Sequence, residues 1–217
     1  SLGAGAAHEL ATPLSTISTA ANELVQQLRN GGKAPDSAAQ YAAMIRAEVE
    51  RCKTVLDHLS GRASAESMEE TEISLPRLVD DVRYRLGESL SCRLDISVPD
   101  RQMVIRVPAE PLRQTIIALV RNGFDASSPD QRVTLRIQPA EQAVDVEVID
   151  CGRGMSEQQS AHAGEPFFTT KAPGAGLGLG LFLARSFASQ MGGSLHWQST
   201  PGAGTAVVLH LPVPATS

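Results

Sequence analysis

Two stretches near the beginning of the chain place apolar residues at alternating intervals of four and three, and this spacing constrains the fold most strongly. It is typical of helices that pack along one apolar seam. Asn30-Gly31-Gly32 predicts the end of the first helix, and Pro35-Asp36-Ser37 predicts the start of the second. The seam residues are Leu10, Leu14, Ile17, Ala21, Leu24 and Leu28 in the first stretch, and Ala42, Ile45, Val49, Cys52, Leu56 and Leu59 in the second.

Two such helices joined by a short loop predict an antiparallel hairpin. A single hairpin cannot bury both seams well, so the pattern favours a homodimer in which two hairpins form a four-helix bundle. The following stretch RASAESMEET is small, polar and acidic, and it predicts a linker at 63–71. We therefore expect a helical dimerisation domain at 1–62 and a second domain at 72–217.

The second domain alternates short strand patterns with helix patterns, which predicts an α/β sandwich with one mixed sheet and helices on one face. The segments VTLRIQ and AVDVEVID lie close enough in sequence to pair as a hairpin. Strands are expected near 72–74, 92–98, 103–107, 131–138, 142–150, 193–199 and 204–212, and helices near 75–87, 108–127 and 177–191.

Composition narrows the classes of partner. Aromatic residues make up 4% of the 217 residues and the formal net charge is −5, so nucleic acid is not an expected partner. No apolar run approaches the length of a membrane span. Because the first residues already look helical, we expect a cytoplasmic fragment of a longer protein, anchored in the inner membrane only through a missing N-terminal sensor region. The three cysteines, Cys52, Cys92 and Cys151, fit a reducing cytoplasm.

The segment AHELATPL carries His8 and Glu9 one turn before Thr12. A zinc-protease helix needs a second histidine at the fifth position of this motif, and Thr12 is a poor zinc ligand, so zinc is excluded. His8 and Thr12 are four residues apart and share a face that lies off the apolar seam. A lone histidine on such a face is often without a role, but Pro13 costs a helix about 3 kcal/mol and indicates a function here.

Two motifs of the second domain place acidic or amide side chains at the end of an element. LVRNGFDAS carries Asn122 and Asp125 late in a helix, where either could be a simple surface residue. VIDCGRGM ends a strand at Asp150, followed by Gly152 and Gly154. A carboxylate there could accept a hydrogen bond from the exocyclic amine of a base, or it could only begin a turn.

A glycine-rich stretch, EPFFTTKAPGAGLGLG, precedes the last expected helix, and the later GAGT precedes the last strand. Glycines before a helix allow backbone N–H groups to approach phosphate, although a loop without a ligand would look the same. Lys171 could pair with phosphate or be solvated. The spacing matches neither the Walker motif nor the dinucleotide motif.

Taken together and in this order, the motifs resemble those of two-component sensor histidine kinases. AHELATPL resembles the phosphoacceptor box, LVRNGFDAS the N box, DCGRG the first glycine box, EPFFTTK the F box, GAGLGLG the second glycine box and GAGT the third. The resemblance covers nearly the whole chain. HELATPLSTI, ERCKTVL and EPFFTTK are most similar to the RegB/PrrB redox-sensing kinases. The resemblance implies a histidine phosphotransfer domain followed by a GHKL-type α/β sandwich that binds ATP and Mg²⁺.

The resemblance implies three roles in the first domain. His8 would accept the phosphoryl group, Glu9 would act as its base, and Thr12 would position water for dephosphorylation of a partner response regulator. Cys52, on the second seam, is either a small core residue or, as in RegB-type kinases, a thiol of redox control. Its neighbours Arg51 and Lys53 would favour the thiolate.

In the second domain, the resemblance implies that Asn122 holds Mg²⁺ and that Asp150 binds the adenine amine. Residues 164–180 would form the ATP lid. The other nucleotide-binding residues implied are Asp125, Gly152, Gly154, Lys171, Gly174, Gly176, Leu177, Gly178, Gly180 and Thr205. The chain departs from the family pattern at Ala118, where many N boxes carry a second Asn, and at Gly123-Phe124.

The expected function is ATP-dependent autophosphorylation of His8, followed by transfer to an aspartate of a response regulator and by regulator dephosphorylation. Two alternatives remain open at this point. One is a catalytically silent, dimeric scaffold that binds nucleotide, which Ala118 alone would favour. The other is a GHKL ATPase or serine kinase without a histidine acceptor, which the HELATPL hairpin argues against.

Overall fold

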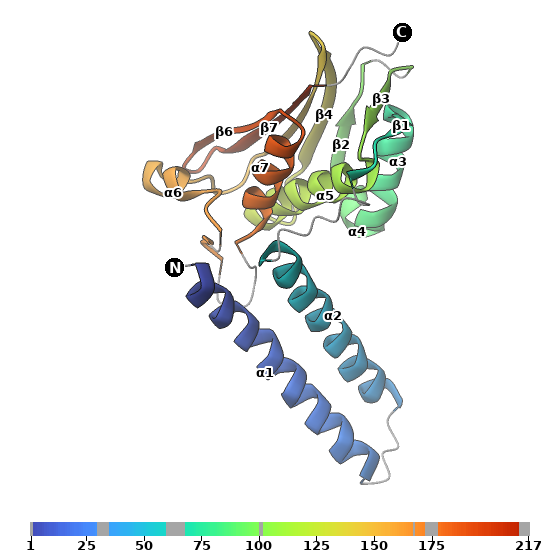
Figure 1. Ribbon diagram of the computed structural model, residues 1–217, viewed down its shortest axis with the longest axis vertical. Coiled ribbons are helices and arrows are strands. Elements are labelled where there is room, and N and C mark those ends of the chain that lie inside the picture. The colour runs from blue at the N-terminus through green and yellow to red at the C-terminus, as the bar shows by residue number, and fades with distance from the viewer. Residues whose placement is uncertain are drawn as a thin grey trace. The chain divides into compact units, whose positions relative to one another are not determined.

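The computed structural model describes residues 2–29, 35–59, 68–99, 102–166, 168–171 and 178–212. In the first two ranges it describes the side chains of residues 13–27, 38–49 and 52. The chain divides into two compact units, Ser1–Ala65 and Glu66–Ser217. Each unit is described by itself below (Figure 1).

The first unit is a helical hairpin. Helix α1 spans Leu2–Arg29, and α2 spans Pro35–Leu59 and lies alongside it (Figure 1). Pro35 is the first residue of α2, where the missing N–H of proline costs no hydrogen bond. No helix in the described part of the chain is long and apolar enough to cross a membrane.

Only part of the apolar surface of the hairpin is covered within one chain. Ala20 is buried, whereas Leu14 is 56% exposed and Val25 is 45% exposed. On α2, Met44 and Val49 are 46% and 48% exposed. Leu14 and Val49 were both expected on the seams. The hairpin therefore leaves apolar side chains of both helices uncovered within one chain.

The second unit is a layer of helices on a five-stranded sheet, which confirms the predicted α/β sandwich (Figure 1). The strand order is β2-β4-β5-β7-β6, with β2 parallel to β4 and the other neighbours antiparallel, so the sheet is mixed as predicted. The strands are β2 Leu94–Ser97, β4 Val133–Ala140, β5 Ala143–Asp150, β6 Ser194–Thr200 and β7 Gly204–Pro212. The covering helices are α3 Leu75–Leu86, α5 Ala109–Ala126 and α7 Gly180–Gln190.

One prediction about the sheet was wrong, because the strands form two sheets. Strand β1, Thr71–Ser74, pairs antiparallel with β3, Val104–Val107, in a separate two-stranded sheet. Both strands are four residues long, and α3 begins directly after β1. Their paired residues Ile73 and Ile105 are buried in the core, so the small sheet extends the helical layer rather than the main sheet.

Two short helices were not predicted. Helix α4 spans Glu88–Ser91 and helix α6 spans Glu157–His162. Helix α6 begins with a capping box, in which the Ser156 hydroxyl accepts from the N–H of Gln159 and the Gln159 side chain accepts from the N–H of Ser156. Each of these helices is too short to show the apolar period of a longer helix.

Helix α5 packs on the core and carries polar residues at its C-terminal end. Its residues Leu112, Ile116 and Val120 are fully buried, at the spacing of one helix face. They pack in one cluster with Leu135 of β4 and Leu209 of β7. Burial of each such side chain contributes about 1.5–3 kcal/mol. This packing fixes the orientation of α5 and therefore the position of the polar residues at its end.

Candidate functional site

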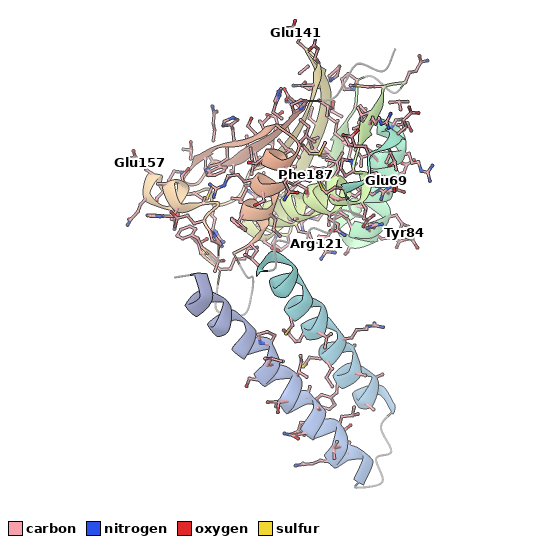
Figure 2. The ribbon with its side chains drawn as sticks, viewed as in Figure 1. Glu69, Tyr84, Arg121, Glu141, Glu157 and Phe187 are labelled. Atoms are coloured by element: carbon pink, nitrogen blue, oxygen red, sulfur yellow. The ribbon has the colours of Figure 1, made fainter. Side chains whose placement is uncertain are left out.

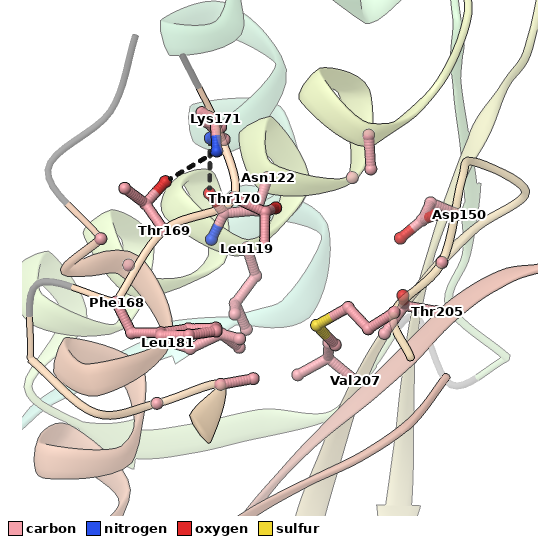
Figure 3. A pocket seen from close by; sticks show the side chains of 18 of the residues that line it. Leu119, Asn122, Asp150, Phe168, Thr169, Thr170, Lys171, Leu181, Thr205 and Val207 are labelled. Atoms are coloured by element: carbon pink, nitrogen blue, oxygen red, sulfur yellow. Dashed lines mark hydrogen bonds between the residues drawn. The ribbon is translucent and has the colours of Figure 1, made fainter. Parts of the chain in front are cut away.

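A pocket of about 310 Å³ opens between α5, the end of β5, strand β7, the segment 168–171 and the start of α7 (Figure 3). Its apolar walls include Leu119, Val148, Leu181 and Val207. The sequence-predicted residues that line it are Asn122, Asp150, Gly154, Lys171, Gly178, Gly180 and Thr205. Elements far apart in the sequence thus bring most of the predicted second-domain residues to one place.

Asp150 is the buried acid of the pocket, with 7% of its surface exposed. Its carboxylate accepts hydrogen bonds from the N–H of Gly152, at 2.9 Å, and from the N–H of Thr205. Burial raises the pKa of this carboxyl above its ordinary value of 3.8, and the two backbone donors oppose part of that rise. An ionised carboxylate only accepts, so Asp150 offers its remaining lone pairs to a donor in the pocket (Figure 3).

Gly152 supports Asp150 and is not among the residues that line the pocket. A Cβ atom at this position would collide with the carbonyl of Ala126, the last residue of α5. That same carbonyl accepts a hydrogen bond from the N–H of Arg153 at 3.0 Å. The loop after β5 therefore lies directly against the end of α5, and only glycine fits where they meet.

At another edge of the pocket, Lys171 contacts two residues of α5, of which Figure 3 shows Asn122. Its Nζ donates to Asp125 Oδ2 at 2.6 Å and to Asn122 Oδ1 at 3.3 Å. Asp125 is exposed and does not line the pocket, so the structure places it behind Lys171 rather than inside the site. These three predicted residues form one charged group although they come from two motifs.

The amide of Asn122 also contacts the first residue of α7. A Cβ atom at Gly180 would lie 2.5 Å from Asn122 Nδ2, so a larger residue here would require the Asn122 amide to move. The Nδ2 side of the amide packs on Gly180 and its oxygen faces Lys171. This orientation is also the one that chemistry requires, because only the amide oxygen can accept from an ammonium.

The N-terminus of α7 closes this side of the pocket. Gly178 and Leu179 precede the helix, and both line the pocket with Gly180 and Leu181. The first N–H groups of a helix lack intrahelical partners and carry partial positive charge, which favours an anion. The predicted residues Gly174, Gly176 and Leu177 lie outside the described residues.

The structure adds residues for which the sequence had suggested no role. Arg153 lines the pocket, and its Nη2 donates to Thr170 Oγ1 at 3.4 Å. Met155 also lines the pocket, as do Phe168 and Thr169 of the segment expected to form the ATP lid. Arg153 directly follows the predicted Gly152 and Met155 directly follows the predicted Gly154, and this proximity was the one signal that could have identified them.

The two departures from the family pattern have different surroundings. Ala118 is half-buried and does not line the pocket. A Cβ atom at Gly123 would lie 3.3 Å from the Cβ atom of Asp150 and from the methyl groups of Val133, so Gly123 lets α5 approach the sheet closely. Phe124 is buried, and the Arg93 guanidinium lies over its ring at 5.0 Å.

The predicted residues of the first unit cannot be placed as side chains. His8, Glu9 and Thr12 belong to α1, but their side chains lie outside the described residues. Pro13 is inside the same helix, as predicted, and is buried.

The pocket combines three chemical features. It has apolar walls, a buried acceptor at Asp150, and a cation beside a helix N-terminus. Such a site suits a flat, mostly apolar group that carries an N–H donor and is linked to an anion. An adenine nucleotide has these parts. Among the described residues, no cluster of three or more His, Cys, Asp and Glu side chains could hold a metal ion.

Two protein families match the chain. The family described as the His Kinase A (phospho-acceptor) domain matches residues 2–68. The family described as the histidine kinase-, DNA gyrase B-, and HSP90-like ATPase matches residues 108–215, which include all the described pocket residues.

Named relatives are similar along nearly the whole chain. The sensor histidine kinase ZraS of Klebsiella oxytoca is 27% identical over 216 residues, which cover 98% of this chain and 46% of that protein. The two-component sensor PprA of Pseudomonas aeruginosa is 29% identical over 221 residues, which cover 97% of this chain and 24% of that protein. The chain therefore spans less than half the length of these relatives.

Solved structures support the fold. Full-length ShkA in complex with AMPPNP has a TM-score of 0.70 at 19% identity, over 100% of this chain and 46% of that one. Histidine kinase ThkA in complex with the response regulator TrrA has a TM-score of 0.67 at 20% identity, over 95% of this chain and 59% of that one. The predicted arrangement, a helical domain followed by a GHKL-type sandwich, is confirmed.

Proposed function

The chain belongs to the two-component histidine kinases, and on that premise we propose that it transfers the γ-phosphoryl group of ATP to His8 and then to an aspartate of a response regulator. The observation that carries the proposal is the pocket in which Asp150 and the Asn122–Lys171 pair lie at separate edges around apolar walls (Figure 3). We assign residues 1–62 to histidine phosphotransfer, 63–71 to a linker whose last residue, Thr71, already begins β1, and 72–217 to ATP binding.

Asp150 would receive the exocyclic amine of adenine. Its carboxylate is buried and held by two backbone donors, so it is oriented before the ligand arrives. Leu119, Val148 and Val207 would enclose the base. Loss of a buried hydrogen bond of this kind costs about 1–3 kcal/mol, which makes Asp150 a residue that selects adenine.

The phosphates would lie toward Lys171 and the first N–H groups of α7. Asn122 would hold Mg²⁺ through its amide oxygen, and neutralisation of phosphate charge is the chemistry that this ion supplies. Mg²⁺ prefers oxygen ligands, and the Asn122 amide supplies one. The ammonium of Lys171 already lies between Asn122 and Asp125, so this position stabilises a cation.

In the transfer step, a nitrogen of the neutral His8 imidazole attacks the γ-phosphorus. An N–P bond forms, the bond from the γ-phosphorus to the bridging oxygen breaks, and ADP leaves with that oxygen. An imidazole with a pKa of about 6.5 is largely neutral at pH 7 and is a competent nucleophile. Glu9 would orient the ring and accept its other proton. The protein contributes mainly by position and by charge, as phosphoryl transfer requires.

Phosphohistidine then passes its phosphoryl group to a carboxylate oxygen of a response regulator, and Thr12 would position water for the later dephosphorylation. Thr12 lies one helical turn from His8, within reach of the same partner surface. Thr12→Ala should therefore spare autophosphorylation and slow the decay of phosphorylated regulator. Equal decay with both proteins would remove this role from Thr12.

The proposed kinase is a homodimer. The exposed apolar residues Leu14, Val25, Met44 and Val49 all belong to the hairpin, and another copy could cover them. The location of the parent protein at the inner membrane, with this part in the cytoplasm, stays a prediction.

Redox control also stays a prediction. Cys52 is half-buried in α2. Neither relative described above is named as a redox sensor, and the similarity to RegB/PrrB therefore rests on the motif sequences alone. The prediction is that oxidation lowers autophosphorylation of the wild type and leaves Cys52→Ala unchanged. An equal loss in both would assign Cys52 to packing.

One incubation with γ-labelled ATP and Mg²⁺ tests the main proposal. The label should become attached to the protein, survive base and be lost in acid, as phosphohistidine requires. His8→Gln should abolish the label and leave binding of ADP unchanged. Nucleotide binding without any label would indicate a silent scaffold, and a label that survives acid would indicate a different acceptor.

A further inference from the structure

Lys171 is a protein cation at the position that the proposed function gives to a bound cation. Its Nζ donates to Asn122 Oδ1 at 3.3 Å and to Asp125 Oδ2 at 2.6 Å. In Figure 3 the Lys171 ammonium and the Asn122 amide lie next to each other, away from Asp150. An ammonium can only donate, so it engages the same amide oxygen that would hold the metal ion.

Asp125 forms the shorter of these two contacts but does not line the pocket. Its side chain is 51% exposed, whereas that of Lys171 is 23% exposed. The carboxylate therefore approaches the ammonium from the solvent side of α5 and has no described contact with the interior of the pocket. Asp125 could therefore affect a ligand only by holding Lys171 or by the electrostatic effect of its own negative charge.

The Asn122 amide lies between Lys171 and the start of α7. Its oxygen accepts from the Lys171 ammonium, and its Nδ2 faces Gly180, at the place where a Cβ atom would be only 2.5 Å away. A ligand that needs this amide oxygen therefore competes for it with the ammonium.

We infer that Lys171 is an internal cation that occupies Asn122 before nucleotide binds, and that Asp125 is a positioning residue that sets how firmly it is held. The inference rests on the proposed function. Nucleotide binding then requires Lys171 to leave Asn122. The apparent affinity is reduced by the fraction of molecules in which Lys171 is held, and a weaker hold raises the affinity.

The test is a double-mutant cycle on the binding of AMPPNP with saturating Mg²⁺, measured by calorimetry. The four proteins are the wild type, Asp125→Asn, Lys171→Met and the double variant. Asp125→Asn should bind AMPPNP about fivefold more tightly than the wild type, the factor expected for a partly exposed ion pair. In the Lys171→Met background, the same change should have a much smaller effect, because there is no ammonium to release.

Two further variants sharpen the test. Lys171→Arg keeps a cation that can pair with Asp125, so Asp125→Asn should again tighten binding in this background. Glu141→Gln removes an equal charge at the turn between β4 and β5, far from the pocket, and should leave the affinity unchanged (Figure 2). Fluorescence of Trp197, the single tryptophan, gives a second readout, because its ring packs beside the pocket residue Gly164.

Two results would overturn the inference. Equal tightening in the wild-type and Lys171→Met backgrounds would show that Asp125 acts only through its charge. Weaker binding by Asp125→Asn would place Asp125 among the groups that bind the nucleotide. If the wild type itself does not bind AMPPNP, the proposed function fails first, and this outcome is distinct from the other two.

Discussion

Gly180 and Asn122 fit together so closely that one added methyl group would separate them. The Cβ atom of an alanine at position 180 would lie 2.5 Å from Asn122 Nδ2, well inside van der Waals contact. The contact joins the start of α7 to the end of α5 and turns the amide oxygen toward Lys171. The last glycine of GAGLGLG therefore has a steric role as well as a place at a helix N-terminus.

Gly180→Ala should weaken binding of Mg²⁺-AMPPNP by about tenfold or more, since a displaced Asn122 amide could no longer hold the Mg²⁺ of the nucleotide, a contact to a charged group worth about 1.5–3 kcal/mol. Calorimetry measures the affinity. The double variant Gly180→Ala/Asn122→Ala is the control for fold, because removal of the amide relieves the clash and should restore the melting temperature. Wild-type affinity in Gly180→Ala would contradict the steric role.

Asp150 should make nucleotide affinity depend on pH. The carboxylate must be ionised to accept from adenine, and burial raises its pKa above 3.8. Affinity should therefore fall as the pH decreases through this raised pKa, at a higher pH than for an ordinary aspartate. Asp150→Asn should bind ADP more weakly at neutral pH, by about 1–3 kcal/mol, and should lack this part of the pH dependence.

The measurement compares calorimetric affinities of the wild type and Asp150→Asn across the acidic range. The titration of the ADP phosphates is common to both proteins and cancels in the ratio. Parallel curves would mean that Asp150 does not touch the base.

Glu110 links α5 to α3 and should add stability that depends on pH. Its carboxylate accepts from both Nη atoms of Arg85, at 2.6 and 2.9 Å, and from Arg113. The Arg85 hydrogen bond lowers the pKa of Glu110 below 4.5. A lowered folded-state pKa gives stability that is present above the unfolded pKa and is lost as the pH falls through the folded value.

Glu110→Gln should accordingly reduce the free energy of unfolding at pH 7 by no more than about 1 kcal/mol, because solvent screens this partly exposed pair. The difference from the wild type should disappear in acid. Urea unfolding at pH 7 and below pH 4.5 measures both values. A difference that persists in acid would show that Glu110 stabilises the fold through packing rather than through its charge.

The exposed apolar side chains of the hairpin should hold two copies together. Met44→Glu places a charge on a residue that is 46% exposed in one chain, and the charge would be buried in the proposed dimer. The mass from light scattering should fall toward that of a monomer. Tyr84→Glu is the matched control, since Tyr84 is an 89% exposed apolar residue of α3 in the other unit (Figure 2). An unchanged mass in Met44→Glu would exclude the surface around Met44 as the interface.

The sequence by itself predicted the elements and the family motifs. Helix α5 was expected at 108–127 and spans Ala109–Ala126, and β5 was expected at 142–150 and spans Ala143–Asp150. These predictions succeed because helix and strand periods are local properties of the chain. The glycine motifs could also be identified from the sequence, because a backbone that lies directly against another backbone or a ligand leaves no room for a side chain.

Tertiary structure alone decided which of these residues meet. Lys171 and Asp125 are 46 residues apart, and nothing in either motif shows that they pair. Leu119, Val148 and Val207 follow the same apolar period as the core, although they line the pocket. β1 and β3 look like any strands, yet they form their own sheet. The physical reason is that periodicity fixes which way a side chain points from its own element, whereas the packing of several elements fixes what it meets there.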